Sequence, residues 1–575
     1  MNEESRAVNK NYSFESALIV SFSAVALLVH LLTNGRYGYF RDELYYIACA
    51  RHLDFGYIDQ PPLSILLLRL SEAFLGDSLF AVRLLPAAAG AVTVALTGVI
   101  ARELGGRTWA IALACAASLC ALFNLAVGNF FSMNAFEPLF WTACIYILVR
   151  VVNSGSPTLW LWLGALLGLS LENKHSTVFF AAGIFVALLL TPERAHFSKK
   201  WIWLGGIIAF AMALPNILWE ARHHWPTYEL LNNIAHSNKN VGLSPTQFIA
   251  QQIVLMNPAT LPLWIAGLLW VFGSRDGGRY RAIGIIYLVT LAEFLLLHGK
   301  SYYLAPAYPM LFAAGGVAIE RAFATRDKWL KSVLLAAILI AGGLFAPLAL
   351  PILPPAKLVE YMRAIHLEPP RTETSHTAAL PQVFADQFGW EQIVGSVAHV
   401  YHHLQPEDEK RAAIFCQNYG EAGAIDFFGA KFGLPPAISG HQNYFLWGPR
   451  DWTSEVVLVL DTNDEDEREQ FASVEGFGTN REQPLGDAIR AANAHFSLPR
   501  FEGKRARALA ACKKVVVRPE CFRDQLRKSS RVNREAFSSL AARSGQSVAD
   551  TESRPFLLKA QSLRRLRGSD SGLPR

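Results

Sequence analysis

The chain has 575 residues, of which 52% are hydrophobic and only 17% are charged. Soluble domains carry about 25% charged residues, so this composition indicates a membrane protein. The apolar residues lie in stretches of about 17 to 22 residues as far as residue 350 and become sparse beyond it. The chain therefore has two regions of different kinds.

The formal net charge of +6 is unevenly distributed. Residues 503–575 carry 18 Lys and Arg against 6 Asp and Glu, so the rest of the chain is net acidic. This basic end has no nucleic-acid-binding motif and little hydrophobic periodicity, so we expect no nucleic-acid partner. The 7 cysteines include no CxxC pair, which gives no sign of a metal framework or a disulfide scaffold.

Eleven stretches have the length and hydropathy of membrane-spanning helices. They cover residues 14–33, 79–100, 108–127, 138–152, 157–171, 176–191, 202–219, 251–272, 282–298, 304–320 and 332–350. With a cytoplasmic N-terminus, the basic residues of the short connections gather inside, as the positive-inside rule requires. An odd number of spans then places residues 351–575 outside.

The first outside segment, residues 34–78, is more than a simple loop. Its sequence predicts two helical pieces, Arg41–His52 and Leu63–Leu75, separated by a turn at residues 56–62. Many aromatic residues are interleaved with them. Aromatic rings favour the headgroup layer, so we expect helices that lie in the membrane interface.

The region after the last span predicts a small α/β domain over about residues 380–500. Ala412–Cys416 and Glu455–Leu460 have the character of strands, and Glu421–Phe432 has that of a helix ending at Gly433. The Ser/Arg-rich remainder lacks an apolar face, which predicts disorder. The expected domains are thus a transmembrane domain over 1–350, an outside α/β domain over 351–502 and a basic tail over 503–575.

Ionisable residues gather at the outside ends of the predicted spans. A charge next to hydrocarbon is costly unless it is paired, solvated or functional. Together they predict a polar cavity that holds an anionic headgroup while its lipid tail stays in the bilayer. They are Asp42, Glu43, Glu137, Lys174, His175, His298 and Lys300.

Each of these residues also has a purely structural interpretation. Asp42 and Glu43 suit the first turn of a helix, and Glu137 precedes Pro138 at a helix start, so all three carboxylates are candidate caps. Lys174 and Lys300 suit lysines whose ammonium groups extend towards lipid headgroups. The residues taken singly leave both interpretations open.

Five segments together resemble the polytopic GT-C glycosyltransferases related to protein O-mannosyltransferases and the lipid A aminoarabinose transferase. The segments are YFRDELY at Tyr39–Tyr45, DQPPL at Asp59–Leu63, FSMNAFEPLFW at Phe131–Trp141, NKH at Asn173–His175 and HGKSYYLAPAYP at His298–Pro309. NYGEA at Asn418–Ala422 and SGHQNY at Ser439–Tyr444 are similar to the periplasmic tail of bacterial members. The resemblance ends near residue 502.

The resemblance implies a multi-pass protein of the bacterial cytoplasmic (inner) membrane, with its N-terminus in the cytoplasm and its α/β domain in the periplasm. It implies an inverting hexosyl- or pentosyltransferase that moves a sugar from a polyprenyl-phosphate donor to a glycolipid, polysaccharide or protein acceptor. The sugar and the acceptor stay open. The implied catalytic carboxylates are Asp42, Glu43 and Glu137.

Other residues of the motifs are assigned to substrate. Lys174, Lys300, Tyr302 and Tyr303 are expected to bind the donor phosphate, and Arg41, Asp59, Gln60, His175 and His298 to bind substrate elsewhere. Exposed Asn418, Tyr419, His441 and Tyr444 are expected to contact the acceptor, unless they only pack a small core. We assign no metal ligand, although paired carboxylates with a histidine are compatible with a divalent ion.

Asp42 is the expected general base for a hydroxyl acceptor, with the lysines and tyrosine hydroxyls stabilising the leaving phosphate. A phosphate acceptor needs no base, and Asp42 would then orient it or bind a metal ion. The main alternative function is a transporter or flippase of lipid-linked solutes. Transporters place their charges near the bilayer midplane, whereas the charges here lie at span ends.

Overall fold

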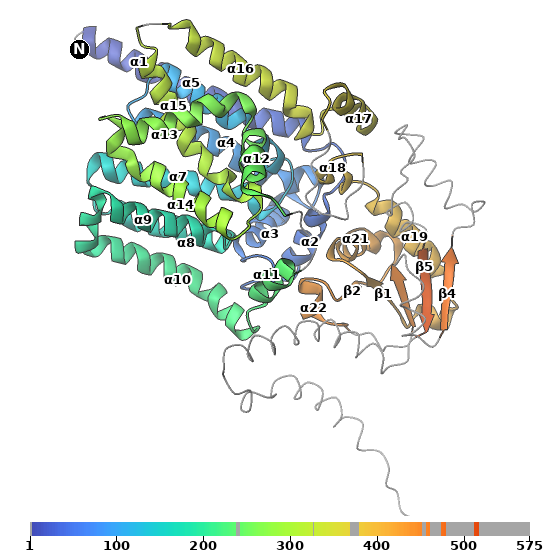
Figure 1. Ribbon diagram of the computed structural model, residues 1–575. Coiled ribbons are helices and arrows are strands. Elements are labelled where there is room, and N and C mark those ends of the chain that lie inside the picture. Colours follow the sequence, from blue (N-terminus) through green and yellow to red (C-terminus); the bar gives the residue numbers. More distant parts are fainter. Residues whose placement is uncertain are drawn as a thin grey trace, which may run out of the picture. The chain divides into compact units, whose positions relative to one another are not determined.

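The structure is a computed structural model that describes residues 3–236, 242–325, 327–367, 379–450, 456–460, 473–478 and 511–516. The residues as far as Val517 form one compact unit (Figure 1). Within this unit a helical region comes first in the chain, and a smaller region with a β-sheet follows.

The helical region extends from α1 to α17. Its elements are α1 Glu3–Thr33, α2 Arg41–Ala50, α3 Leu63–Leu75, α4 Leu79–Glu103, α5 Thr108–Cys120, α6 Leu122–Val127, α7 Met133–Ser154, α8 Leu159–Asn173, α9 Thr177–Leu190, η1 Pro192–Ser198, α10 Lys200–Arg222, α11 Pro226–His236, α12 Pro245–Leu255, η2 Pro258–Thr260, α13 Leu261–Gly273, η3 Gly277–Tyr280, α14 Arg281–Leu296, η4 Ser301–Ala307, α15 Tyr308–Ala322, α16 Trp329–Phe345, η5 Ala346–Leu348 and α17 Pro355–Ala364.

Each of the eleven predicted spans contains a helix. Among the described residues six helices are long and apolar enough to cross a membrane, or eight if each of two bent pairs is one span. The count of eleven crossings therefore stays a prediction, and so does the outside location that depends on it. The two predicted helices of the first outside segment correspond to α2 and α3.

Local sequence explains where predicted spans are interrupted. The chain bends by 101° after α9, where Pro192 begins η1, and by 97° between α12 and α13. At the second bend Asn257 has a φ of +70° and its side chain accepts a hydrogen bond from the backbone of Ala259 (3.1 Å). A proline that lacks an N–H favours such breaks.

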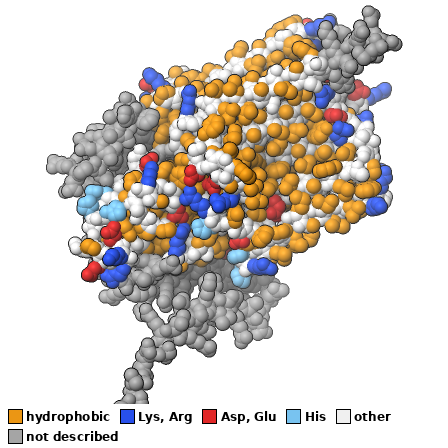
Figure 2. Space-filling view, turned by 180° about the vertical axis from the view of Figure 1, so that it is seen from behind, with side chains coloured by type: hydrophobic (Ala, Val, Ile, Leu, Met, Phe, Trp, Pro, Cys, Tyr) orange, Lys and Arg blue, Asp and Glu red, His pale blue; other side chains and the backbone are white. Residues whose placement is uncertain are grey.

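The surface of the helical region suits a bilayer. Figure 2 shows a broad hydrophobic face with charged side chains mostly towards its borders. In the apolar segments of α10 and α16 only 17% of the residues are buried, so most of their side chains point away from the protein. Hydrocarbon covers such side chains at no cost, which is consistent with a multi-pass membrane protein.

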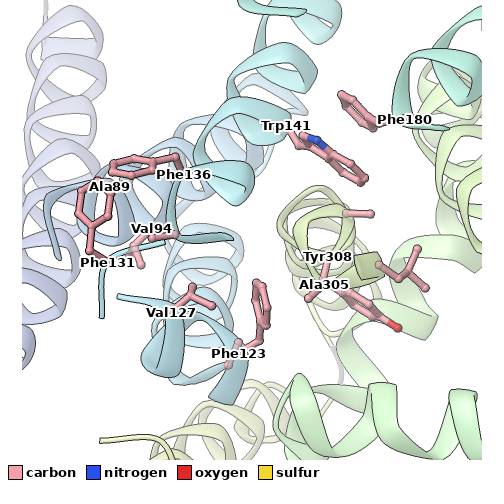
Figure 3. Close-up of a cluster of buried hydrophobic side chains, with 14 of the residues drawn as sticks. Ala89, Val94, Phe123, Val127, Phe131, Phe136, Trp141, Phe180, Ala305 and Tyr308 are labelled. Atoms are coloured by element: carbon pink, nitrogen blue, oxygen red, sulfur yellow. The ribbon is translucent and has the colours of Figure 1, made fainter. Parts of the chain in front are cut away.

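The interior of the helical region is a packed core of aromatic and small side chains. Figure 3 shows Trp141 of α7 facing Phe180 of α9, and their ring centroids are 4.3 Å apart with nearly parallel planes. Tyr308, at the start of α15, is fully buried in the same core. This packing fixes the helix ends that carry the site.

The smaller region contains a five-stranded mixed sheet in the order β2-β1-β3-β5-β4. Its parallel part pairs Ile414 of β1 with Ala437 of β2 and Leu458 of β3, and β5 runs antiparallel to β3 and β4. The elements are α18 Gln382–Ala385, α19 Trp390–His402, α20 Pro406–Glu409, β1 Ala412–Cys416, α21 Tyr419–Phe428, η6 Gly429–Phe432, β2 Ala437–Ser439, α22 Asn443–Trp447, β3 Val456–Leu460, β4 Ser473–Gly478 and β5 Ala511–Val516.

The expected strands correspond to β1 and β3. The helix expected over Glu421–Phe432 is instead α21, which ends at Phe428, followed by the 3-10 helix η6, and the φ of +69° at Gly433 suits a helix stop. The sheet also includes β5, which lies beyond residue 502 in the segment expected to be disordered. The rest of residues 503–575 lies outside the described part of the chain. The domain boundaries themselves stay predictions.

Candidate active site

Helix α2 carries the Asp42-Glu43 pair. Glu43 is fully buried and its carboxylate accepts four hydrogen bonds: two from Arg83 of α4 (2.9 and 2.8 Å) and one from each of the backbone N–H groups of Phe40 and Phe131 (both 2.8 Å). The bond from Phe40 is part of the helix cap, as the structural interpretation of this residue expected. With its oxygens fully engaged, Glu43 is better suited to holding the helix than to reacting.

Arg83 is completely buried and contacts several groups at once. In addition to Glu43, its guanidinium donates to the backbone oxygens of Asn34 (3.1 Å), Arg36 (3.3 Å) and Gly38 (2.8 Å). It therefore fixes the loop that leads into α2. An arginine within an apolar span is itself a signal for a buried partner, but the sequence does not say which carboxylate that partner is.

Asp42 differs from its neighbour in both exposure and partners. Its side chain is 32% exposed. Oδ1 accepts a hydrogen bond from the Tyr419 hydroxyl (2.7 Å) and lies 3.4 Å from Nε of Arg41. No hydrogen bond from the described residues reaches Oδ2. Asp42 thus presents one held oxygen and one accessible oxygen, which suits a proton acceptor.

The guanidinium group of Arg41 interacts mainly with carboxylates. It lies beside Asp42, and its NH1 is 3.4 Å from Oδ2 of the buried Asp386. The guanidinium carbon also lies 5.4 Å from the ring centroid of Tyr419. These contacts tie α2 to the region around α18 and α21.

Asp59 and Gln60 form a tight turn next to α2. Tyr57 and Gln60 exchange backbone hydrogen bonds (3.0 and 3.3 Å), and Oδ1 of Asp59 accepts from the Tyr45 hydroxyl (2.9 Å). Burial raises the pKa of Asp59 to about 7, the charge of Asp42 adds to the rise, and the bond from Tyr45 opposes it. The Gln60 side chain is completely buried, and its amide has no hydrogen-bond partner among the described residues.

Glu137 and Lys174 form a buried ion pair, with Nζ of Lys174 2.7 Å from Oε2 of Glu137. The Ser176 hydroxyl donates to the other oxygen. The Lys174 ammonium also lies 4.4 Å from the ring centroid of Tyr303 and 5.8 Å from that of Tyr302. The ammonium group of Lys174 therefore does not extend towards lipid headgroups. It is held between a carboxylate and two aromatic rings.

A series of contacts connects this ion pair with α2. The backbone N–H of Met133 donates to the Tyr46 hydroxyl (3.2 Å), and the Asn173 amide donates to the Met133 carbonyl (2.9 Å). Lys174 in turn lies against the rings of Tyr302 and Tyr303. The structure thus brings together the ends of α2, α7 and α8 with η4.

The remaining basic candidates are less constrained. Lys300 is half-buried and forms no ion pair or side-chain hydrogen bond with the described residues, so its ammonium is available to an anion. His298 is exposed, with a φ of +53°. His175 is half-buried and its Nε2 lies 3.0 Å from the side-chain oxygen of Asn216, which ties it to α10.

The four residues expected to contact an acceptor have different environments. The side chain of Asn418 caps α21 by accepting from the backbone of Gly420 (2.9 Å) and Glu421 (3.0 Å). Tyr444 is buried and donates to Asp426 (3.0 Å), so its expected exposure is wrong. The Tyr419 ring lies 5.1 Å from that of His441, and its hydroxyl reaches Asp42 instead of solvent.

Several residues at the site were not predicted. They are Tyr45, Tyr46, Arg83, Ser176, Asp386 and Asn443, which lie in the contacts described above or, for Asn443, accept from the backbone of Ile58 (2.7 Å). Most are distant in sequence from the group they contact. Arg83 within an apolar span was the one local signal among them, and it did not identify its partner.

No group of three or more His, Cys, Asp or Glu side chains among the described residues converges in a way that could hold a metal ion. The carboxylates of the site are instead paired with arginine, lysine or tyrosine. No chemical step is assigned to a divalent ion.

The chain matches the family model for dolichyl-phosphate-mannose-protein mannosyltransferase over residues 59–219. This segment includes Asp59, Glu137 and Lys174 but not Asp42 or Lys300. Among curated proteins, the lipid A galacturonosyltransferase RgtD of Rhizobium johnstonii is 26% identical over 288 residues, or 48% of this chain. The match covers 60% of that relative, which is less than two thirds of its length.

Two crystal structures of ArnT from Cupriavidus metallidurans are similar in fold. The one bound to undecaprenyl phosphate has a TM-score of 0.54 at 13% identity, covering 88% of this chain and 99% of ArnT. The apo structure has the same TM-score at 12% identity, covering 86% and 97%. The chain thus shares a sequence segment with this mannosyltransferase family, is related in sequence to RgtD, and has a fold similar to that of ArnT.

Proposed function

We propose that the chain transfers a sugar from a polyprenyl-phosphate donor to an acceptor at the outer face of the cytoplasmic membrane, with inversion at the anomeric carbon. The observation that carries the proposal is the arrangement of Asp42, with one oxygen held by Tyr419 and the other accessible. Lys174 lies against the rings of Tyr302 and Tyr303 in η4, and Lys300 directly precedes that element.

The reaction needs two groups on opposite sides of the anomeric carbon. A hydroxyl of the acceptor attacks this carbon, and Oδ2 of Asp42 accepts its proton. The bond between the carbon and the phosphate oxygen breaks, and the electron pair leaves with the polyprenyl phosphate. The accessible Lys300 ammonium, assisted by the hydroxyls of Tyr302 and Tyr303, stabilises the developing charge.

Glu137 has a supporting role in this scheme. Its carboxylate holds Lys174 against the tyrosine rings, so the ammonium is already desolvated and oriented when a phosphate approaches. When the donor phosphate binds, the ammonium group of Lys174 interacts with the phosphate as well as with Glu137. Glu43 keeps α2 in place, and Asp59 is left to contact the sugar, whereas the Gln60 side chain is completely buried.

For the acceptor we propose an envelope glycolipid of the lipid A class. The relative RgtD is named for lipid A, and ArnT has the same fold and was crystallised with undecaprenyl phosphate. If the acceptor group is a phosphate, no base is needed, and Asp42 orients the acceptor.

Purified full-length chain in lipid nanodiscs, supplied with lipid A and a set of undecaprenyl-phosphate sugars that includes galacturonic acid and aminoarabinose, tests the proposal. Mass spectrometry should detect one added sugar on lipid A. For a hydroxyl acceptor, Asp42→Asn should lower turnover by about 10² or more while undecaprenyl phosphate still binds. Asp77→Asn, at an exposed surface carboxylate, is the matched control.

Three outcomes contradict parts of the proposal. When the chain is placed in closed lipid vesicles, movement of the donor across the bilayer without a new glycosidic bond favours a transporter or flippase. Sugar addition to a protein or polysaccharide but not to lipid A overturns the acceptor class. Near-normal transfer to a hydroxyl by Asp42→Asn overturns the assignment of the base and leaves the transferase function intact.

A further inference from the structure

The sheet-containing region reaches Asp42 directly, and we propose that Tyr419 is a positioning residue that holds this carboxylate in its reactive orientation. The α/β region is then part of the catalytic apparatus instead of only an acceptor-binding domain. This inference rests on the proposed function, because it assigns Tyr419 to the proton acceptor of that reaction.

The position of Tyr419 follows from the sheet. It begins α21, directly after the carboxyl end of β1, and Asn443 begins α22 a few residues after the carboxyl end of the neighbouring parallel strand β2. Carboxyl ends of adjacent parallel strands lie at the same edge of a sheet, where open α/β sheets place their functional loops. Here that edge supplies contacts to α2 and to the turn at Asp59.

The Tyr419 ring is held by several groups. Its centroid lies 5.0 Å from that of Tyr45 and 5.1 Å from that of His441, and the Arg41 guanidinium lies 5.4 Å from it. These contacts orient the ring, and its hydroxyl then lies 2.7 Å from Oδ1 of Asp42. The hydrogen bond is therefore a consequence of packing and needs no reorganisation when substrate binds.

The backbones of α21 and α2 are in close contact. A Cβ atom on Gly423 would lie 2.8 Å from the carbonyl carbon of Leu44 and 3.0 Å from the backbone nitrogen of Tyr45, so a glycine is required there. A second contact is formed by Asn443, whose side-chain oxygen accepts from the backbone of Ile58 (2.7 Å). Asp42 and Asp59 thus both depend on the α/β region.

The hydroxyl matters because the end of an aspartate side chain rotates easily. The χ2 angle of aspartate is broadly distributed, so an unheld carboxylate samples many orientations. A hydrogen bond to Oδ1 restricts this rotation and leaves Oδ2 facing the accessible side.

Tyr419→Phe in the full-length chain tests the proposal, because phenylalanine keeps the ring and removes only the hydroxyl. Turnover should fall by about 10- to 100-fold, while the KM for the donor and the affinity for undecaprenyl phosphate stay unchanged. Tyr401→Phe, which removes a hydroxyl bonded to the Glu409 carbonyl in α19–α20, is the matched control.

The double variant Asp42→Asn/Tyr419→Phe separates positioning from general stability. If the hydroxyl acts through the carboxylate, the double variant should be no slower than Asp42→Asn alone. Additive losses would indicate a structural role and overturn the proposal, as would unchanged turnover in Tyr419→Phe.

A chemical measurement tests the contact without sugar transfer. A water-soluble carbodiimide modifies accessible carboxyls, and mass spectrometry can follow the rate of its reaction at Asp42. The rate should be higher in Tyr419→Phe than in wild type and Tyr401→Phe, because the carboxylate is no longer held at Oδ1. If the rate changes and no sugar is transferred from any donor, the proposed function fails and the contact stands, whereas an unchanged rate overturns the contact.

Discussion

Arg83 of α4 and Glu43 of α2 form a two-pronged ion pair in which neither side chain is exposed to solvent. The pair joins a predicted span to the first helix of the outside segment. It leaves the adjacent Asp42 at the surface of the site, so neighbouring carboxylates have opposite environments.

Glu43→Gln should destabilise the protein more than it affects chemistry. An amide would place an N–H group against the donors of Arg83 and the backbone, leaving a buried charge without its partner. Breaking such a pair costs about 3 to 5 kcal/mol. Thermal unfolding in detergent should show a marked decrease in Tm, whereas Glu360→Gln, at an exposed pair in α17, should change little. A stable, inactive Glu43→Gln would instead support a chemical role.

Substitutions of Lys300 and Lys174 should have different effects on donor binding and on stability. Lys300→Ala should weaken undecaprenyl phosphate binding by about tenfold or more without loss of stability, because a charged hydrogen bond is lost. Lys174→Met should lower stability, because it leaves Glu137 buried and unpaired.

Lys174→Met/Glu137→Gln provides the control for that comparison. Removing both charges should restore much of the stability but not the affinity for undecaprenyl phosphate, measured by titration in detergent. Lys357→Ala, at an exposed lysine, should change neither property. Full recovery of affinity in the double variant would show that Lys174 does not bind the donor.

The raised pKa of Asp59 makes stability depend on pH. In the folded protein this carboxyl keeps its proton up to about pH 7, whereas in the unfolded chain it loses it near the ordinary value of 3.8. Between these values the folded state holds the additional proton, so this group's contribution to stability decreases as pH rises through that window. Asp59→Asn removes the effect, so the Tm of the variant minus that of wild type should increase from pH 5 to pH 8. A constant difference would contradict the raised pKa.

The topology predicts an outside location for the chain after the last span. A phosphatase reporter that is active only outside the cytoplasm should therefore be active when fused after residue 360 and inactive after residue 105, in a predicted inside connection. Activity with the opposite pattern would place all proposed site residues on the cytoplasmic side. The reporter thus tests the location of the proposed reaction.

The sequence directly showed the apolar stretches, the residues that start or stop helices, and the order of the motifs. Each predicted apolar stretch contains a helix because burial in hydrocarbon or protein imposes the same local composition on it. Gly433 and Pro192 interrupt helices for backbone reasons that are also local. The uneven lengths of the helices were harder to predict, because a break such as the one at Ala121 has no strong sequence marker.

The sequence by itself determined the class of protein and the residues in question: a helical membrane region, a small α/β region, and a set of carboxylates, lysines and tyrosines at the ends of helices. Only the tertiary structure decided what each one contacts. Glu43 meets Arg83, Lys174 meets Glu137, and Asp42 meets Tyr419, across 40, 37 and 377 positions of the chain. The hydropathy of a segment can be calculated from consecutive residues alone. The role of a charged side chain depends on its partner, and the packing of helices that are distant in sequence determines which partner it meets.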